Sequence, residues 1–215
     1  MKVKLDLTNH FPTSESLKGD YDLFINGFNG CERVSYRKEL KGESNNLKEI
    51  ATLSKKYDKS IISAFDTDNY GIIKRSAGVF DKGKLLGVSD ATVSYEYSGY
   101  MPSAGGKLYD LSCGKIALAV CDDIYSFGLF KSFAVCGAEL TIAITNDTKK
   151  EINSILIRAY SFLLGVPTIL LFCGGAYISD VKGNLTVVDL NGEDTFTIQP
   201  YFEYVLKTTK TRLNR

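Results

Sequence analysis

The sequence is poor in histidine, and this limits the chemistry open to it. The single histidine among the 215 residues is His10, which lies just before Pro12 in a stretch with the composition of a loop. A Ser–His or Cys–His catalytic pair would therefore have to use His10. A metal site built from several histidines is excluded. We expect His10 to be a surface residue.

Cysteine is too sparse and too scattered to build a disulfide framework or a zinc site. The cysteines are odd in number and no two have the C-x-x-C spacing. Free thiols are typical of a reducing compartment, so we expect a cytoplasmic protein that holds neither a metal nor another cofactor. The five cysteines are Cys31, Cys113, Cys121, Cys136 and Cys173.

The chain also lacks a strong charge of either sign and any long apolar run. Lys and Arg total 26 against 25 Asp and Glu, a formal net charge of +1. This balance predicts no attraction to nucleic acid or to an anionic membrane. No apolar stretch approaches the roughly 20 residues of a membrane span, and the first residues do not resemble a signal peptide. The basic end, from about residue 206, is expected to be a flexible, solvated tail.

The patterns that are present predict a single α/β domain over residues 1–215. From Lys115 to Phe172 apolar strands alternate with amphipathic helices, the pattern of βαβ units. The sequence DKGK, with Gly83, predicts a hairpin turn that needs a positive φ. Strands are expected at 2–7, 21–26, 60–65, 72–80, 84–91, 107–111, 115–121, 140–145, 166–172, 184–190 and 194–198, and helices near 45–57, 127–136 and 148–164.

The stretch around Cys121 is the most informative. An apolar strand (Lys115–Cys121) delivers this cysteine into a short polar turn, and a helix follows. Open α/β sheets bind ligands at the carboxyl ends of their strands. The N–H groups at the start of the helix would lower the pKa of the thiol and stabilise an oxyanion. The same pattern also fits a structural cysteine, because free cysteine is a common buried residue.

The nucleophile segment of the carbon–nitrogen hydrolases (the nitrilase and amidase superfamily) resembles this stretch. In that family a strand delivers Cys into a C-x-D turn, and an apolar helix and GA[DE]L follow; here Cys121-Asp122-Asp123 precedes Gly137-Ala138-Glu139-Leu140. The resemblance continues in the family's order through YDLFIN, SAGVFDKGKLLGVSD, YEYSGYMPSAGGKLYDL, Arg158-Ala159 with GVPTILLFCGG, and KGNLTVVDLNGE. It implies a four-layer α-β-β-α sandwich of two mixed sheets and a homodimer formed through helices that include the one after Cys121. The implied substrate is a small-molecule amide, nitrile or related acyl compound.

The sequence departs from the family at two of the three catalytic positions. The family uses a Glu as general base, a Lys to stabilise the tetrahedral intermediate and the Cys as nucleophile. The Glu position falls on Phe28, which cannot move a proton, and the Lys position falls on Asp90. An aspartate there would oppose a nearby thiolate or oxyanion and raise the pKa of Cys121. The resemblance therefore implies an incomplete triad.

Other residues are candidates for the missing roles. Glu96 matches a second Glu found in many family members, and is either a substitute base or an exposed carboxylate. Glu32 is a displaced base if the register differs, and Lys82 or Lys84 replaces the lysine if the hairpin turn reaches the site.

Two acidic residues follow the cysteine directly. Asp122 and Asp123 are expected to cap the next helix or to bond nearby backbone rather than to hold Mg²⁺.

Three functions stay open at this point. The first is an amidase-like hydrolase with Cys121 as nucleophile, Glu96 as base and backbone N–H groups as oxyanion donors, its activity weak or altered. The second is a pseudoenzyme that keeps the fold to bind a small molecule or a partner, because loss of a base alone costs about 10²–10⁴ in rate. The third is an unrelated α/β protein with Cys121 in its core.

One outer layer is expected to be thin. The residues between the first two strands include Pro12 and Gly19 and read as a loop, where the family has a helix. This loss would expose part of the sheet.

Overall fold

The protein consists of two mixed β-sheets packed face to face. The computed structural model describes residues 1–8, 10–28, 33–94, 99–148, 150–190 and 194–200. In the first sheet the strand order is β13-β1-β2-β4-β5-β6, with β3 paired to β4; in the second it is β12-β11-β10-β9-β8-β7. The first sheet contains β1 (Lys2–Asp6), β2 (Leu23–Asn26), β3 (Val34–Ser35), β4 (Ser60–Asn69), β5 (Ile72–Asp81), β6 (Lys84–Asp90) and β13 (Thr195–Thr197). The second contains β7 (Lys107–Leu111), β8 (Gly114–Val120), β9 (Leu140–Ile144), β10 (Thr168–Phe172), β11 (Gly175–Ser179) and β12 (Leu185–Asp189).

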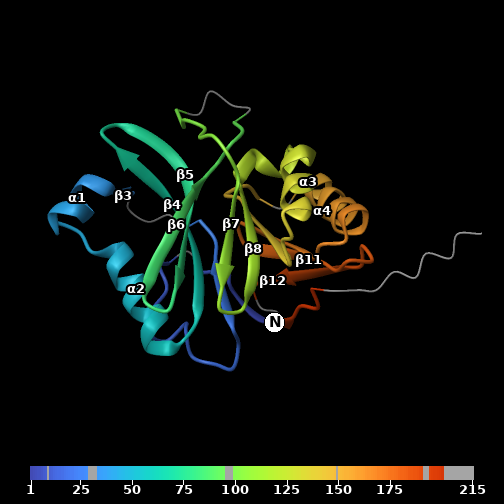
Figure 1. Ribbon diagram of the computed structural model, residues 1–215, viewed down its shortest axis with the longest axis horizontal. Helices are drawn as coiled ribbons and strands as arrows, with labels where there is room; N and C mark the ends of the chain where they lie inside the picture. The colour runs from blue at the N-terminus through green and yellow to red at the C-terminus, as the bar shows by residue number, and fades with distance from the viewer. Residues whose placement is uncertain (9, 29–32, 95–98, 149, 191–193, 201–215) are drawn as a thin grey trace, which may run out of the picture.

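Helices cover the outer face of each sheet (Figure 1). On one side lie α1 (Tyr36–Lys41) and α2 (Asn46–Tyr57), and on the other α3 (Phe127–Val135) and α4 (Glu151–Leu164). A short 3₁₀ helix, η1 (Cys121–Tyr125), separates β8 from α3. The four-layer α-β-β-α sandwich expected from the resemblance is confirmed.

Alternation along the strands builds these layers. In β4, Ile62 and Ala64 pack in the central core between the two sheets, whereas Ile61 and Phe65 pack in the outer core that contains Ile50 of α2. A strand points successive side chains to opposite faces, so a strand buried on both sides is apolar throughout. The helix-facing core of the second sheet is built in the same way.

Parallel strands bring several chain turns to one edge of the molecule. β1, β2 and β4 run parallel in the first sheet, and β8, β9 and β10 run parallel in the second. The residues that follow β2, β8, β9 and β10 therefore meet at the carboxyl edges of the two sheets, where the candidate site lies.

The predicted helices are confirmed, and three elements were not predicted. α2 and α4 end at αL caps, Asp58 and Gly165, and the hairpin turn holds Gly83 at φ +83° as expected. The elements that the sequence did not predict are α1, β3 and β11. α1 has no buried residue and hence no apolar stripe, β3 spans only two residues, and β11 begins at a glycine directly after a Gly-containing turn.

A loop takes the place of the outer helix between β1 and β2. Leu17 and Tyr21 are 1% and 2% exposed and pack with Phe24, so this loop covers β2 rather than leaving it bare. The expected loop is confirmed. The exposure of the sheet that was expected with it does not occur at β2, because two large side chains of the loop cover this strand.

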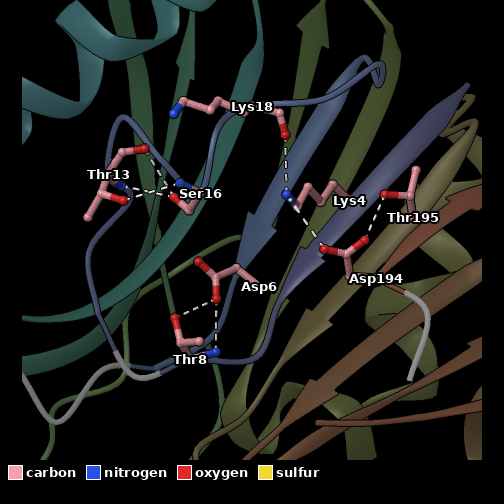
Figure 2. Close-up of polar contacts among 8 residues, drawn as sticks. All are labelled: Lys4, Asp6, Thr8, Thr13, Ser16, Lys18, Asp194 and Thr195. Atoms are coloured by element: carbon pink, nitrogen blue, oxygen red, sulfur yellow. Dashed lines mark hydrogen bonds and ion pairs between the residues drawn. The ribbon is translucent and has the colours of Figure 1, made fainter. Parts of the chain in front are cut away.

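Polar contacts hold this loop in place (Figure 2). Thr13 N–H donates to Ser16 Oγ at 2.9 Å, and Ser16 N–H donates to Thr13 Oγ1 at 3.2 Å. Lys4 Nζ donates to the Lys18 carbonyl at 3.3 Å and lies 3.5 Å from Asp194 Oδ2. These contacts tie the loop to β1 and to the segment before β13.

No helix among the described residues is long and apolar enough to cross a membrane. The basic tail expected from about residue 206 lies outside the described residues.

Candidate functional site

Cys121 lies where the sequence places it, at the end of β8 and the start of η1. Its backbone has φ +52°, in the left-handed region that residues other than glycine seldom adopt. Such backbone strain, of order 1–3 kcal/mol, is concentrated at functional sites. The side chain is 8% exposed. The predicted strand, cysteine and turn are present; the turn takes the form of η1, and α3 follows it as predicted.

The thiol opens into a small polar cavity. This cavity has a volume of about 220 Å³ and is lined by residues after β8 and β9, by β5 and by the chain between β6 and β7. Its wall includes several polar side chains: Arg75, Tyr100, Asp122, Asn146, Asp147 and Lys150.

A second cavity adjoins the first. It measures about 260 Å³, shares Thr145 and Asn146 with the first cavity, and has Phe28 and Leu171 in its wall. Together the two cavities form a polar and an apolar hollow at the shared strand edge. A larger cavity of about 390 Å³ near Asp180 and Phe196 does not include Cys121.

Arg75 contacts the thiol directly. Its Nη1 donates to Cys121 Sγ at 3.6 Å. The guanidinium Cζ lies 4.3 Å from the ring centroid of Tyr100 and 6.0 Å from that of Phe28. Arg75 was not predicted from the sequence, because it is one polar residue of a strand and lies 46 positions away from the cysteine.

Asn146, at the end of β9, is a second residue that the sequence did not single out. Its Oδ1 lies 3.9 Å from Cys121 Sγ, which donates the weak hydrogen bond. The signal was its place directly after a buried parallel strand, next to β8 in the sheet.

Burial raises the pKa of the Cys121 thiol to about 12. The positive charge and hydrogen bond of Arg75 lower this pKa, as does a backbone hydrogen bond from Asn146, but desolvation outweighs them. The expected lowering of the pKa by a helix start is therefore wrong. The free thiol is protonated at neutral pH.

Asp90 does not face the cysteine. Its Oδ2 lies 3.0 Å from Lys74 Nζ and its Oδ1 accepts a hydrogen bond from Ser76 Oγ at 2.8 Å. Lys74 and Ser76 flank Arg75 on β5, so they point to the opposite face of the sheet. The expected rise of the Cys121 pKa through Asp90 is wrong; among carboxylates, the one that contributes to the rise is Asp122.

The other candidates for the missing roles lie elsewhere. Phe28 is partly buried beside Arg75, in the wall of the second cavity. Glu96 and Glu32 lie outside the described residues. Lys82 and Lys84 lie at the β5–β6 turn, next to Asp81, which accepts from Ser112 before β8. Cys121 follows β8, so both lysines are at the opposite end of the sheets.

Asp123 has the structural role expected of it. It is 1% exposed; its Oδ1 accepts from the Thr92 and Val93 N–H groups at 2.7 and 2.9 Å, and its Oδ2 accepts from the Val120 N–H at 3.0 Å. Burial raises its pKa despite these hydrogen bonds. It thus ties the start of η1 to the chain after β6.

Asp122 lies in the wall of the polar cavity. In the part of the chain that the structure describes, no three His, Cys, Asp or Glu side chains gather as a metal site would require. His10 is exposed, and neither cavity has it in its wall.

Comparisons with protein-family models and with curated proteins give no match. Solved structures do match. Nit3 of Saccharomyces cerevisiae, a member of branch 10 of the nitrilase superfamily, is 16% identical with a TM-score of 0.72, over 90% of this chain and 88% of that one. The fold is that of the nitrilase superfamily. A carbon–nitrogen hydrolase from Helicobacter pylori G27 is 18% identical with a TM-score of 0.67, over 81% and 75% of the two chains.

A third similar structure contains a ligand. It is a cysteine-to-alanine variant of the amidase from Nesterenkonia sp. AN1 in complex with butyramide, 14% identical with a TM-score of 0.68, over 88% of this chain and 90% of that one. At these identities the likeness establishes the nitrilase fold of this chain, and the activity has to be argued from its own site.

Proposed function

We propose that this chain is a divergent carbon–nitrogen hydrolase that acts on a small amide or related acyl compound, with Cys121 as its nucleophile. The observation that carries the proposal is the position of the thiol. It lies in a strained left-handed conformation at the carboxyl edge of β8, opens into a cavity, and is 3.6 Å from a guanidinium.

The similar structures support this assignment. The amidase from Nesterenkonia sp. AN1 binds butyramide in one variant, and in another acrylamide has added to its active-site cysteine. The polar cavity of about 220 Å³ is below the usual 300–1,000 Å³ of pockets for drug-sized ligands, so a short acyl group is the best fit.

Turnover is expected to be slow at neutral pH. The thiol must lose its proton before it attacks, and burial raises its pKa to about 12. Phe28 offers no base, and among the described residues no carboxylate is hydrogen-bonded to Cys121 Sγ. Glu96, the base expected from the sequence, lies outside the described residues. With solvent hydroxide as the base, the rate rises with pH.

The test is ammonia release from short-chain amides and nitriles at pH 7 and pH 9, combined with intact-mass detection of an acyl group on Cys121. We expect slow release that is faster at pH 9, a thioester on Cys121, and loss of both in Cys121→Ala. Release that persists in Cys121→Ala, or no release by the wild-type protein, would overturn the proposal.

The alternative is a pseudoenzyme that binds a small molecule or a partner with the same cavity. The raised pKa of Cys121 and the phenylalanine at the base position favour it. Calorimetry separates the two: equal binding of an amide by wild type and Cys121→Ala, with no acyl-enzyme, supports the alternative.

A further inference from the structure

Arg75 is a partly buried cation that has no carboxylate partner among the described residues. The ion pairs formed within 4.0 Å in this part of the chain do not include it. Charges taken out of water are normally paired, since their desolvation is costly. Arg75 donates a hydrogen bond to the thiol of Cys121 instead.

Aromatic side chains hold the guanidinium in this position. The guanidinium lies over the ring of Tyr100, and its Cζ is also 6.0 Å from the ring centroid of Phe28. Tyr100 is fixed by a hydrogen bond from its hydroxyl to Asp66 Oδ2 at 2.8 Å and by a bridge to Ile73. The carboxylate of Asp66, directly across the ladder from Arg75, accepts the hydrogen bond of Tyr100 and forms no ion pair with Arg75 within 4.0 Å, and Arg75 lines the cavity.

We infer that Arg75 is a catalytic residue that supplies the positive charge missing from the lysine position, and that it stabilises both the Cys121 thiolate and the oxyanion formed on the substrate. The inference rests on the proposed function. Arginine suits this role because its guanidinium stays charged and presents several N–H donors in one plane.

The steps balance with water as the only other reactant. Solvent hydroxide removes the thiol proton, and Cys121 Sγ attacks the carbonyl carbon of the amide. The C–S bond forms while the π electron pair moves to oxygen, where Arg75 N–H groups donate to the oxyanion. The C–N bond then breaks, and the amine leaves with a proton from water. A second water molecule cleaves the thioester, which releases the carboxylic acid and restores the thiol.

The test removes the charge of Arg75 and measures the reactivity of the Cys121 thiol separately from amide turnover. Arg75→Gln and Arg75→Met both remove the charge, and Arg75→Lys keeps it. Lys74→Gln is the matched control, because it removes a neighbouring positive charge that contacts Asp90 instead. Thermal unfolding selects the variants that are folded, and acrylamide addition to Cys121 is followed by peptide mapping from pH 7 to pH 10.

We expect the neutral variants to react with acrylamide about three- to tenfold more slowly at each pH. Loss of an opposite charge at this distance raises the pKa of Cys121 by about one unit or more, so less thiolate is present. The thiolate that does form is more nucleophilic, which partly offsets the loss. Arg75→Lys and Lys74→Gln should react within about twofold of wild type. Amide turnover should fall by about 10²–10³ in the neutral variants.

Two results would overturn the inference. One is an unchanged acrylamide rate in both neutral variants, and the other is an equal loss in Lys74→Gln. Failure of the proposed function would give a different result, namely no amide turnover by the wild-type protein. In that case the ratio of the acrylamide rates of the neutral variants and the wild type still decides whether Arg75 acts on the thiol.

Discussion

At the scale of single residues, two opposing effects act on Cys121. Burial removes water from the thiolate, and Arg75 together with Asn146 supplies part of the lost stabilisation. Because desolvation is the larger effect, the resting site holds a neutral thiol. The thiol and the guanidinium line the same cavity, so a substrate carbonyl that enters it would have both groups in its wall.

Asp123 helps to hold the nearby Cys121 in its strained backbone conformation. Its carboxylate accepts hydrogen bonds from Val120, Thr92 and Val93 N–H groups while buried. Removal of a buried carboxylate leaves these donors unsatisfied.

We therefore predict that Asp123→Ala lowers the free energy of unfolding by about 2–4 kcal/mol. The matched variant Asp122→Ala, at the neighbouring and less buried position, should cost under about 1 kcal/mol. Urea denaturation of both variants at pH 7 measures this difference. Equal costs would show that the hydrogen bonds of Asp123 do not hold η1 in place.

At the scale of elements, the period of the apolar residues predicted most of the structure. The buried strands β8, β9 and β10 and the helices α2 and α4 each leave a continuous or periodic apolar signal. α1 leaves none, because no residue of it is buried. The order of the layers came from the resemblance to the nitrilases, which periodicity alone does not supply.

The candidate site was predictable only in part, for a geometric reason. Cys121 and Asp123 follow a recognisable strand and are marked by local sequence. Arg75 reaches the thiol from the other sheet, and the face it occupies depends on the register of the β5–β6 hairpin. A shift of one residue exchanges the two faces of a strand. Asp90 could therefore align in sequence with the family's catalytic lysine although its side chain points away from the site.

At the scale of the whole molecule, α3 and α4 lie together on the outer side of the second sheet (Figure 1) and expose apolar side chains to solvent. The large apolar side chains exposed on these helices are Phe127 (44%), Val135 (79%), Ile152 (49%), Ile155 (53%), Phe162 (57%) and Leu163 (67%). Exposed apolar patches on soluble domains commonly mark interfaces. The homodimer and the cytoplasmic location expected from the sequence stay predictions.

We predict a homodimer that buries this face. The double substitution Ile155→Glu and Phe162→Glu should yield a monomer, because it places two charges in the apolar contact. Leu40→Glu on α1, at a side chain 89% exposed on the other side of the molecule, should leave the dimer intact. Sedimentation equilibrium gives the masses. A wild-type monomer at micromolar concentration would contradict the prediction.

The most direct test of the nucleophile is the pH dependence of Cys121 alkylation by iodoacetamide in the wild-type protein, with peptide mapping and Cys121→Ser as control. A reachable thiol with a pKa raised to about 12 predicts labelling that grows about tenfold per pH unit and does not level off by pH 9. No labelling of Cys121 while the exposed Cys136 and Cys173 react would contradict a nucleophile that opens into the cavity. A plateau near neutral pH would contradict the dominance of burial and reveal a thiolate already prepared for attack.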